Sequence, residues 1–285
     1  MRFGISIFPT AYSIRPGELA TAAEDRGFDS FWAPEHSHIP VSVFTPGRDQ
    51  PGLPAMYYDL VDPFVALSMA AEATRTLLLG TSICLVAQRD PIQLAKQVAS
   101  IDVLSGGRFL FGVGSGWNGP EMANHGTLLE QRHAIMRERI DAMKVGWTEV
   151  KAEYHGKYVD FGPMYAWPKP HQKPHPPILL AAEPSKTFKR VLDYADGWLP
   201  IIDANNTGAL EHVPRLRERA QTVGRDPDSI EISLYIMCPP NEDLMQRAMS
   251  AGVHRVILLM DPAPRDEALK ILDSYAALMV GCQPG

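Results

Sequence analysis

The sequence predicts a (β/α)8 TIM barrel, an α/β fold in which eight parallel strands close into a ring and each is followed by a helix. Short apolar runs alternate with amphipathic segments eight times between Arg2 and Val280. An unbroken alternation of this kind favours a closed barrel over an open sheet. The 285 residues, 45% of them hydrophobic, are enough to bury one large core. We therefore expect one domain over residues 1–285.

The expected elements follow one another from the start of the chain. Helices are predicted to begin at Asp62-Pro63 and Asp90-Pro91, because an acid followed by proline is a common helix start, and one is predicted to end at Gly27. Strands are expected at 2–8, 28–33, 77–85, 108–114, 178–182, 197–202, 230–238 and 253–260, and helices at 17–26, 63–74, 91–104, 128–150, 184–195, 205–224, 242–252 and 264–280.

Two long insertions interrupt this alternation, one after the second strand and one after the fourth. They cover residues 34–62 and 151–177; the second contains a predicted hairpin at 154–161 and five prolines between 168 and 177. Loops of this length in compact domains are usually functional. We expect both to cover the barrel mouth, the end where the strands finish and where barrels of this class place their sites.

The fourth strand ends in a glycine-rich stretch with the residues Gly112, Gly114, Gly116 and Gly119. Glycine lets a ligand approach the backbone closely, so these residues are expected to form one wall of a site, or alternatively a strand end that turns tightly. The stretch also matches the dinucleotide fingerprint. That fingerprint belongs to the first strand-to-helix turn of an open sheet, and here several strand-helix units come first.

Histidines occur at only one predicted strand end, in Glu35-His36-Ser37-His38. A histidine can give or take a proton near neutral pH, and an adjacent carboxylate can fix its tautomer or hold a cofactor hydroxyl. Two other interpretations stay open. The histidines can be ordinary loop residues, or His36 and His38 can form half of a metal site with Glu183 and Asp261 from later strand ends.

Composition narrows the classes of partner. The net charge of −6 argues against a nucleic-acid or anionic-membrane surface and favours a small-molecule substrate. The three cysteines are odd in number and far apart, which favours reduced thiols and a cytoplasmic location. No apolar run is long enough to span a bilayer, and the chain begins directly with a strand, so we expect a soluble protein that is not exported.

Four stretches, residues 27–36, 79–83, 104–118 and 195–200, together resemble the luciferase-like monooxygenase superfamily. Within it they are similar to the branch that uses the deazaflavin coenzyme F420 in place of FMN. The resemblance extends from Met1 to about Ala277. It implies a homodimer and an isoalloxazine-type ring in the barrel mouth. It also implies that a bulge in the third strand, with a non-prolyl cis peptide between Ser82 and Ile83, backs that ring.

The resemblance also implies roles for particular residues. Glu35 and His36 are expected at the ring edge and in substrate protonation, with Ser82 and Ile83 behind the ring. Three further residues are expected along the cofactor, namely Gly114, Ser115 and Gly116.

Two positions depart from the pattern of the branch. Trp117 stands where its sugar-phosphate dehydrogenases have a catalytic carboxylate, which favours an apolar or aromatic substrate in contact with Trp117 and His38. A Gly-Gly pair that often binds the cofactor phosphate is replaced by Glu183-Pro184-Ser185. Ser185 and Lys186, near a predicted helix start, become the candidates for that phosphate.

The predicted function is therefore that of an F420-dependent oxidoreductase without a resident metal. A deazaflavin has carbon in place of the flavin N5 and passes a hydride, while His36 supplies or takes the matching proton. The main alternative is an FMN-dependent monooxygenase on the same barrel. A non-catalytic flavin-binding protein and a metal-dependent hydrolase are the others.

Overall fold

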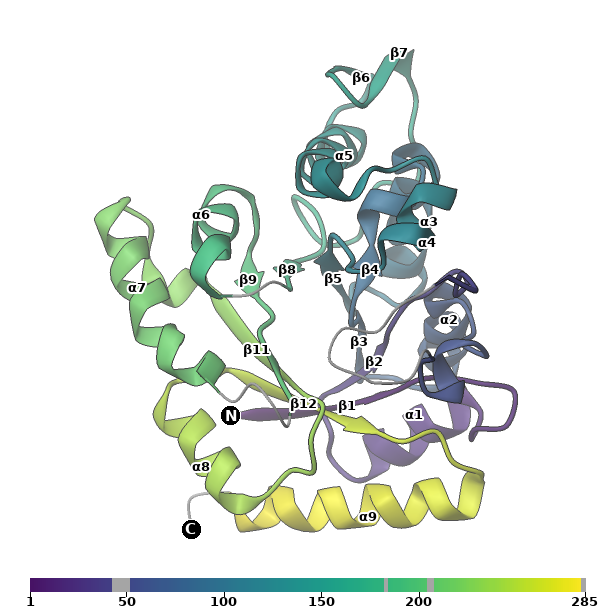
Figure 1. The fold of residues 1–285 in the computed structure, drawn as a ribbon, viewed down its shortest axis with the longest axis vertical. Coiled ribbons are helices and arrows are strands. Elements are labelled where there is room, and N and C mark those ends of the chain that lie inside the picture. The colour runs from purple at the N-terminus through teal and green to yellow at the C-terminus, as the bar shows by residue number, and fades with distance from the viewer. Residues whose placement is uncertain (43–51, 182–183, 204–207, 283–285) are drawn as a thin grey trace.

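A computed structural model describes residues 1–42, 52–181, 184–203 and 208–282, and it confirms the closed parallel barrel (Figure 1). Neighbouring strands follow the order β10-β11-β12-β1-β2-β3-β5-β8-β9, and β9 also pairs with β11, which closes the ring. The barrel strands are β1 (Arg2–Ile7), β2 (Ser30–Ala33), β3 (Leu78–Thr81), β4 (Cys84–Leu85), β5 (Phe109–Gly114), β8 (Ile178–Leu180), β9 (Gly197–Trp198), β10 (Ile201–Ile202), β11 (Glu231–Ile236) and β12 (Arg255–Met260).

Two of the eight expected strands are each divided in two. The third becomes β3 and β4, and the sixth becomes β9 and β10, where Pro200 has no N–H to continue the ladder. Helices surround the ring: α1 (Pro16–Asp25), α2 (Pro63–Ala73), α3 (Pro91–Leu104), α4 (Gly119–Asn124), α5 (Arg132–Thr148), α6 (Pro184–Tyr194), α7 (Val213–Thr222), α8 (Glu242–Ser250) and α9 (Arg265–Gly281). Short 3-10 turns are η1 (Ala55–Tyr57), η2 (Val86–Gln88), η3 (Leu129–Gln131), η4 (Gly208–His212) and η5 (Pro227–Ser229).

The helix starts follow the capping chemistry of the sequence. Asp62 Oδ1 accepts a hydrogen bond from the N–H of Phe64 at 2.9 Å, and Asp90 Oδ1 accepts one from Gln93 at 2.8 Å. One expected helix was wrong in extent: the segment 128–150 yields α5 only from Arg132, preceded by the separate short helix α4. None of the described helices is both long enough and apolar enough to cross a membrane.

The barrel strands are buried on both faces. Along β12, Val256 and Leu258 pack with the helices, whereas Ile257 belongs to a second apolar cluster inside the ring. Such strands read as nearly continuous apolar runs because neither face meets water. The interior cluster consists of Trp32, Leu110, Leu179, Ala181, Leu199, Tyr235 and Ile257.

Trp32 fills the barrel interior because its neighbours have no side chain. A Cβ at Gly80 would lie 2.1 Å from Trp32 Cε3, and one at Gly4 would lie 2.9 Å from Trp32 Nε1. Trp32 Nε1 donates to Ser30 Oγ at 2.8 Å, so the buried indole also has a polar partner. The glycines of the first and third strands thus leave room for one large ring.

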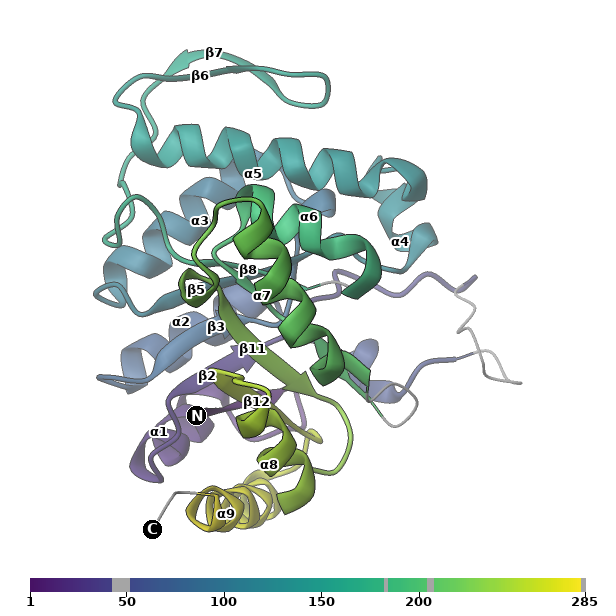
Figure 2. The same ribbon diagram turned by 90° about the vertical axis from the view of Figure 1, so that its left-hand side faces the viewer.

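The two insertions take different positions. Val61, near the end of the first, donates its backbone N–H to Pro9 at the mouth, so this end of the insertion lies where it was expected, whereas residues 43–51 lie outside the described part of the structure. The second was expected at the mouth and is not there. Its hairpin, β6 (Ala152–His155) and β7 (Asp160–Met164), projects beyond α5 (Figures 1 and 2). The second insertion follows the helix α5 and not a strand. Because a barrel helix runs back from the mouth, the chain has already returned to the amino-terminal side of the barrel where this insertion begins.

Gly80→Ala is expected to destabilise the protein because the new methyl group overlaps the Trp32 ring. Overpacking of a dense core typically costs about 1–3 kcal/mol in the free energy of unfolding, measurable by urea denaturation. Gly146→Ala is the matched control, since a Cβ there meets nothing within 4 Å and the position is helical. Equal stability of the two variants would contradict the packing described for Trp32.

Candidate active site

His36 pairs with a buried carboxylate at the barrel mouth. Its Nδ1 lies 2.8 Å from Glu121 Oε2, and the two side chains are 7% and 0% exposed. His36 lies in the loop after β2 and Glu121 in the first turn of α4, which follows β5, so the closed barrel joins residues 85 positions apart. A carboxylate on Nδ1 fixes both the tautomer and the orientation of an imidazole.

Glu121 is ionised at neutral pH. Burial acts to raise the pKa of Glu121, but the hydrogen bond and charge of His36, together with the N–H of Ser37, outweigh that effect, and the net shift is downward. The Ser37 N–H lies 2.9 Å from Glu121 Oε1, so both carboxylate oxygens accept hydrogen bonds. Glu121 can therefore orient His36 and stabilise its charged form.

Aromatic rings lie beside His36. The ring of Tyr57, from η1, has its centroid 5.4 Å from that of His36, and Trp117 meets His36 edge-on at 5.6 Å. Phe8, at the end of β1, lies 4.9 Å from Tyr57. Trp117 is 45% exposed. An apolar rim next to one imidazole is typical of a pocket for a small apolar or aromatic molecule.

The third strand breaks where the family resemblance implied a bulge. The peptide bond between Ser82 and Ile83 is cis, which confirms the expectation, and it lies between β3 and β4. Ser82 Oγ lies 3.2 Å from Ser6 Oγ, which lies 3.0 Å from Tyr235 Oη. Burial raises the pKa of Tyr235 to about 12, so this buried row of hydroxyls is uncharged.

Ile83 and the glycines of β5 fit together at the bulge. A Cβ at Gly114 would lie 1.9 Å from Ile83 Cδ1, and one at Gly112 would lie 1.9 Å from the carbonyl oxygen of Thr81. These two glycines therefore serve the packing of one strand against the next. Gly116 has φ +78° and, like Ser115, is partly exposed where the strand ends, so these two residues remain accessible from the mouth.

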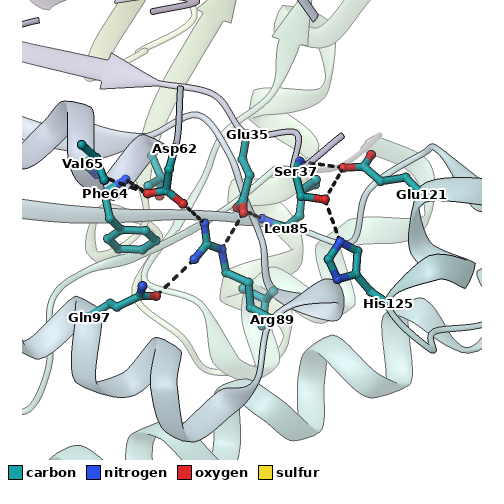
Figure 3. Close-up of polar contacts among 12 residues, drawn as sticks. Glu35, Ser37, Asp62, Phe64, Val65, Leu85, Arg89, Gln97, Glu121 and His125 are labelled. Carbon is teal, nitrogen blue, oxygen red and sulfur yellow. Dashed lines mark hydrogen bonds and ion pairs between the residues drawn. The ribbon is translucent and has the colours of Figure 1, made fainter. Parts of the chain in front are cut away.

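Glu35 is held by an arginine that the sequence analysis did not single out. Its Oε1 accepts from Arg89 Nε at 2.5 Å and its Oε2 from the Leu85 N–H at 2.7 Å. Arg89 also donates to Asp62 at 2.7 Å and Gln97 at 3.1 Å (Figure 3). Glu35 was expected at the ring edge, yet both of its oxygens accept hydrogen bonds from Arg89 and the Leu85 N–H. We call Arg89 with its partners Glu35, Asp62 and Gln97 the Arg89 clamp, and in this clamp Glu35 has a structural role.

The same contacts determine the protonation states of Arg89 and of the neighbouring Cys84. Burial acts to lower the pKa of Arg89, but the nearby acidic groups, Glu35 first and Asp62 among them, together outweigh it and the net shift is upward, so the guanidinium stays charged. Burial, with Glu35 beside it, raises the pKa of Cys84 and keeps that thiol protonated. Glu35 and Asp62 are the second and the last residues of the first insertion, so Arg89 ties together both ends of the loop that carries His36.

The structure describes the surroundings of His38 but not those of the predicted phosphate-binding side chains. His38 is half-buried beside α4, where its Nε2 is 2.8 Å from Asn124 Nδ2. Ser185 and Lys186 fall within α6, but their side chains, like residue Glu183, lie outside the described part of the structure. The phosphate site after the fifth strand therefore stays a prediction.

The sequence analysis missed Glu121, although a signal for it was present. Asn118 caps α4, with its Oδ1 3.4 Å from the N–H of Glu121, and Pro120 stands in the first turn. An asparagine, a proline and an acid in this order mark a helix start. The helix was expected only from residue 128, so the acid was not placed at the mouth.

The alternative of a metal site involved Glu183, which lies outside the described part of the structure. Across the described ranges, no three histidine, cysteine, aspartate or glutamate side chains are grouped so that they could hold a metal ion. His36 and His38 instead turn to different partners, Glu121 and Asn124.

Comparison with known proteins gives the family. The family described as luciferase-like monooxygenase matches residues 1–274. The chain belongs to this luciferase-like family. An uncharacterized protein of Mycobacterium tuberculosis is 37% identical over 286 residues, covering 99% of this chain and 100% of that protein. The F420-dependent hydroxymycolic acid dehydrogenase of the same organism is 27% identical over 214 residues, covering 74% of this chain and 55% of that enzyme.

Solved structures share the luciferase-like barrel. The monooxygenase RslO1 from Streptomyces bottropensis has a TM-score of 0.77 at 20% identity and 99% coverage of both chains. An F420-dependent secondary alcohol dehydrogenase with an F420-acetone adduct has a TM-score of 0.75 at 18% identity and full coverage of both. The oxygenating component of 3,6-diketocamphane monooxygenase from Pseudomonas putida, solved with FMN, has a TM-score of 0.64 at 18% identity, covering 88% and 72%. At these identities the likeness shows the fold.

Arg89→Met is expected to destabilise this luciferase-like protein by about 3 kcal/mol, because it leaves the buried Glu35 carboxylate without its cation. The free energy of unfolding from urea denaturation is the measurement. The double variant Arg89→Met/Glu35→Gln should recover part of the loss, since a neutral amide tolerates burial better than an unpaired charge. If the double variant is less stable than Arg89→Met, the ion pair is not the source of the effect.

Proposed function

We propose that this protein is a coenzyme F420-dependent oxidoreductase that transfers a hydride between the cofactor and a small apolar or aromatic substrate. Its family consists of oxidoreductases and monooxygenases, and it has an F420-dependent relative. The observation that carries the proposal is the pairing of His36 with ionised Glu121, in a loop whose Glu35 bonds to Leu85 just beyond the Ser82–Ile83 bulge. It combines a proton-handling group with a surface suited to a flat ring.

The residues at the bulge fit such a ring. Ile83 is partly buried against the interior cluster, Gly114 adds no side chain beside it, and Ser115 and Gly116 are accessible at the strand end. Together with Ser82 they would hold the cofactor, and Ser185 and Lys186 would bind its phosphate. When bound, a deazaflavin supplies a ring carbon that accepts or gives a hydride.

His36 would handle the accompanying proton. Since ionised Glu121 holds the proton on Nδ1, the neutral ring presents a lone pair at Nε2. Nε2 can then take a hydroxyl proton as a substrate is oxidised, or return one as a carbonyl is reduced. Glu121 stabilises the imidazolium in between, as a carboxylate does for a general base.

The rim points to the substrate class. Tyr57 and Trp117 place aromatic surface next to His36, and Trp117 is the more exposed of the rings described there. We propose that Trp117 contacts the apolar part of the substrate and His38 a polar part of it. Apolar walls with one polar group fix the orientation of a small molecule.

An FMN-dependent monooxygenase is the second candidate. It is favoured by the structural likeness to a monooxygenase over 99% of both chains, and by a further fold neighbour solved with FMN. The same bulge would accept either ring, because the two tricyclic ring skeletons have the same size and differ at one atom, carbon in place of N5. The two candidate functions are therefore distinguished by which cofactor the protein binds.

Titration of the purified protein with F420 and with FMN, followed by fluorescence, separates the candidates. We expect F420 to bind at least tenfold more tightly, a difference of about 1.4 kcal/mol. Tighter binding of FMN, with oxygen consumption in the presence of a flavin reductase, would establish the monooxygenase instead. Binding of neither would overturn both.

His36→Ala should lower turnover at saturating cofactor by roughly a hundred to ten thousandfold, the usual contribution of a placed proton-transfer group. Affinity for F420 should stay within about tenfold. Glu121→Gln should lower turnover less, because it removes the orienting charge and leaves the imidazole. His155→Ala is the control, since that exposed histidine lies on the β6–β7 hairpin. Full activity of His36→Ala would place the proton transfer elsewhere.

A further inference from the structure

The hydroxyl of Ser37 joins the buried His36–Glu121 pair to two further histidines, His38 and the exposed His125. Ser37 Oγ lies 3.3 Å from Glu121 Oε1, 2.9 Å from His38 Nδ1 and 2.6 Å from His125 Nε2. Figure 3 shows Ser37 between Glu121 and His125. His125 is exposed and ends α4, the helix that carries Glu121. A continuous row of hydrogen-bonding groups therefore leads from His36 to solvent.

The donors along this row can be assigned. Asn124 Nδ2 can only donate, so His38 Nε2, at 2.8 Å, must accept. Neutral His38 then carries its proton on Nδ1 and donates it to Ser37 Oγ. His38 is thereby fixed as a hydrogen-bond donor to the Ser37 hydroxyl. The other two, Glu121 and His125, are left to share the single proton of Ser37.

The direction of that proton depends on His125. When His125 Nε2 is bare, the Ser37 O–H donates to it over the shorter distance of 2.6 Å. When His125 is protonated, its N–H donates to Ser37 Oγ, and the hydroxyl proton turns to Glu121 Oε1 at 3.3 Å. Glu121 then accepts from the Ser37 O–H in addition to its existing donors, the Ser37 N–H and His36.

We propose that Ser37 is a positioning residue for His36, and that the proton on His125 controls it. An added donor on Glu121 spreads the carboxylate charge and weakens its hold on the His36 imidazolium, so His36 releases its proton more readily. The role in turnover rests on the proposed function, in which His36 moves the substrate proton. The coupling itself is a property of the protein without cofactor.

Other titratable groups contact this network. Glu121 on α4 and His38 on the first insertion bond to Ser37, the His38 and His125 rings lie 5.6 Å apart, and Tyr57 on η1 packs against His36. His38 is therefore the group most easily confused with His125, and its variant belongs in the test.

Histidine-labelled protein without cofactor, observed by ¹⁵N NMR between pH 5 and 9, tests the coupling. We expect the His36 ring nitrogens to show two inflections, one of which coincides with the titration of His125. Ser37→Ala should remove the second inflection while leaving the His36–Glu121 bond, because the backbone N–H that holds Glu121 remains. His125→Gln should remove it as well. Ser37→Thr, which keeps the hydroxyl, should retain it.

Two controls assign the inflection. His155→Gln, on the distant hairpin, should leave both inflections in place. A second inflection that persists in His125→Gln and vanishes in His38→Gln would overturn the assignment to His125. A single inflection in the unmodified protein, or a second one that survives in Ser37→Ala, would overturn the coupling through Ser37.

Turnover supplies a second measurement. At a pH where His125 is protonated and the Ser37 hydroxyl donates to Glu121, Ser37→Ala should lower kcat about tenfold, the effect of losing one hydrogen bond to a charged group. KM should stay within about twofold, and Ser37→Thr should restore kcat. Unchanged kcat in Ser37→Ala would overturn the positioning role. Failure to bind F420 would sink the proposed function and leave the NMR coupling intact, so the two failures are distinguishable.

Discussion

The mouth of this barrel depends on the buried ion pair between Glu35 and Arg89. A buried carboxylate is costly unless it is paired and hydrogen-bonded, so Glu35 must face Arg89 and the N–H of Leu85. These contacts fix the end of β2 to the strand just beyond the cis bulge. Asp62 adds the start of α2 to the same guanidinium. His36 follows directly after Glu35, so the contacts that hold Glu35 also fix the position of His36.

The two acids of the site have separate tasks for a geometric reason. Glu35 and His36 are adjacent, and neighbouring side chains of an extended segment point in opposite directions. Glu35 therefore meets α2 and α3 through Arg89, while His36 meets α4 through Glu121. One carboxylate holds the frame and the other, from a distant part of the chain, orients the imidazole.

Hydride transfer and oxygenation are both compatible with a barrel of this family. The groups at the mouth present an imidazole beside apolar surface, and the cofactor site proposed there would serve either chemistry. What distinguishes a deazaflavin from a flavin is an atom of the cofactor. Sequence likeness to an F420-dependent dehydrogenase and structural likeness to monooxygenases are therefore consistent with each other.

The sequence alone determined much of this protein, because local patterns carry the necessary information. Alternating strand and helix signals predicted the barrel, and Asp62 and Asp90 predicted two helix starts, while the resemblance to the luciferase-like superfamily implied the bulge at Ser82 and Ile83. Each of these depends on residues close together in the chain, where capping, periodicity and motif can be read directly.

The tertiary structure decided which side chains meet. Arg89 and Glu121 lie on different strand-helix units from Glu35 and His36. The sequence around Glu35 or His36 therefore does not indicate which distant residue it contacts. The second insertion was misplaced because the choice between the two ends of the barrel depends on whether a strand or a helix precedes it. Closing eight strands into a ring brings these distant segments together, and that closure is a property of the whole chain.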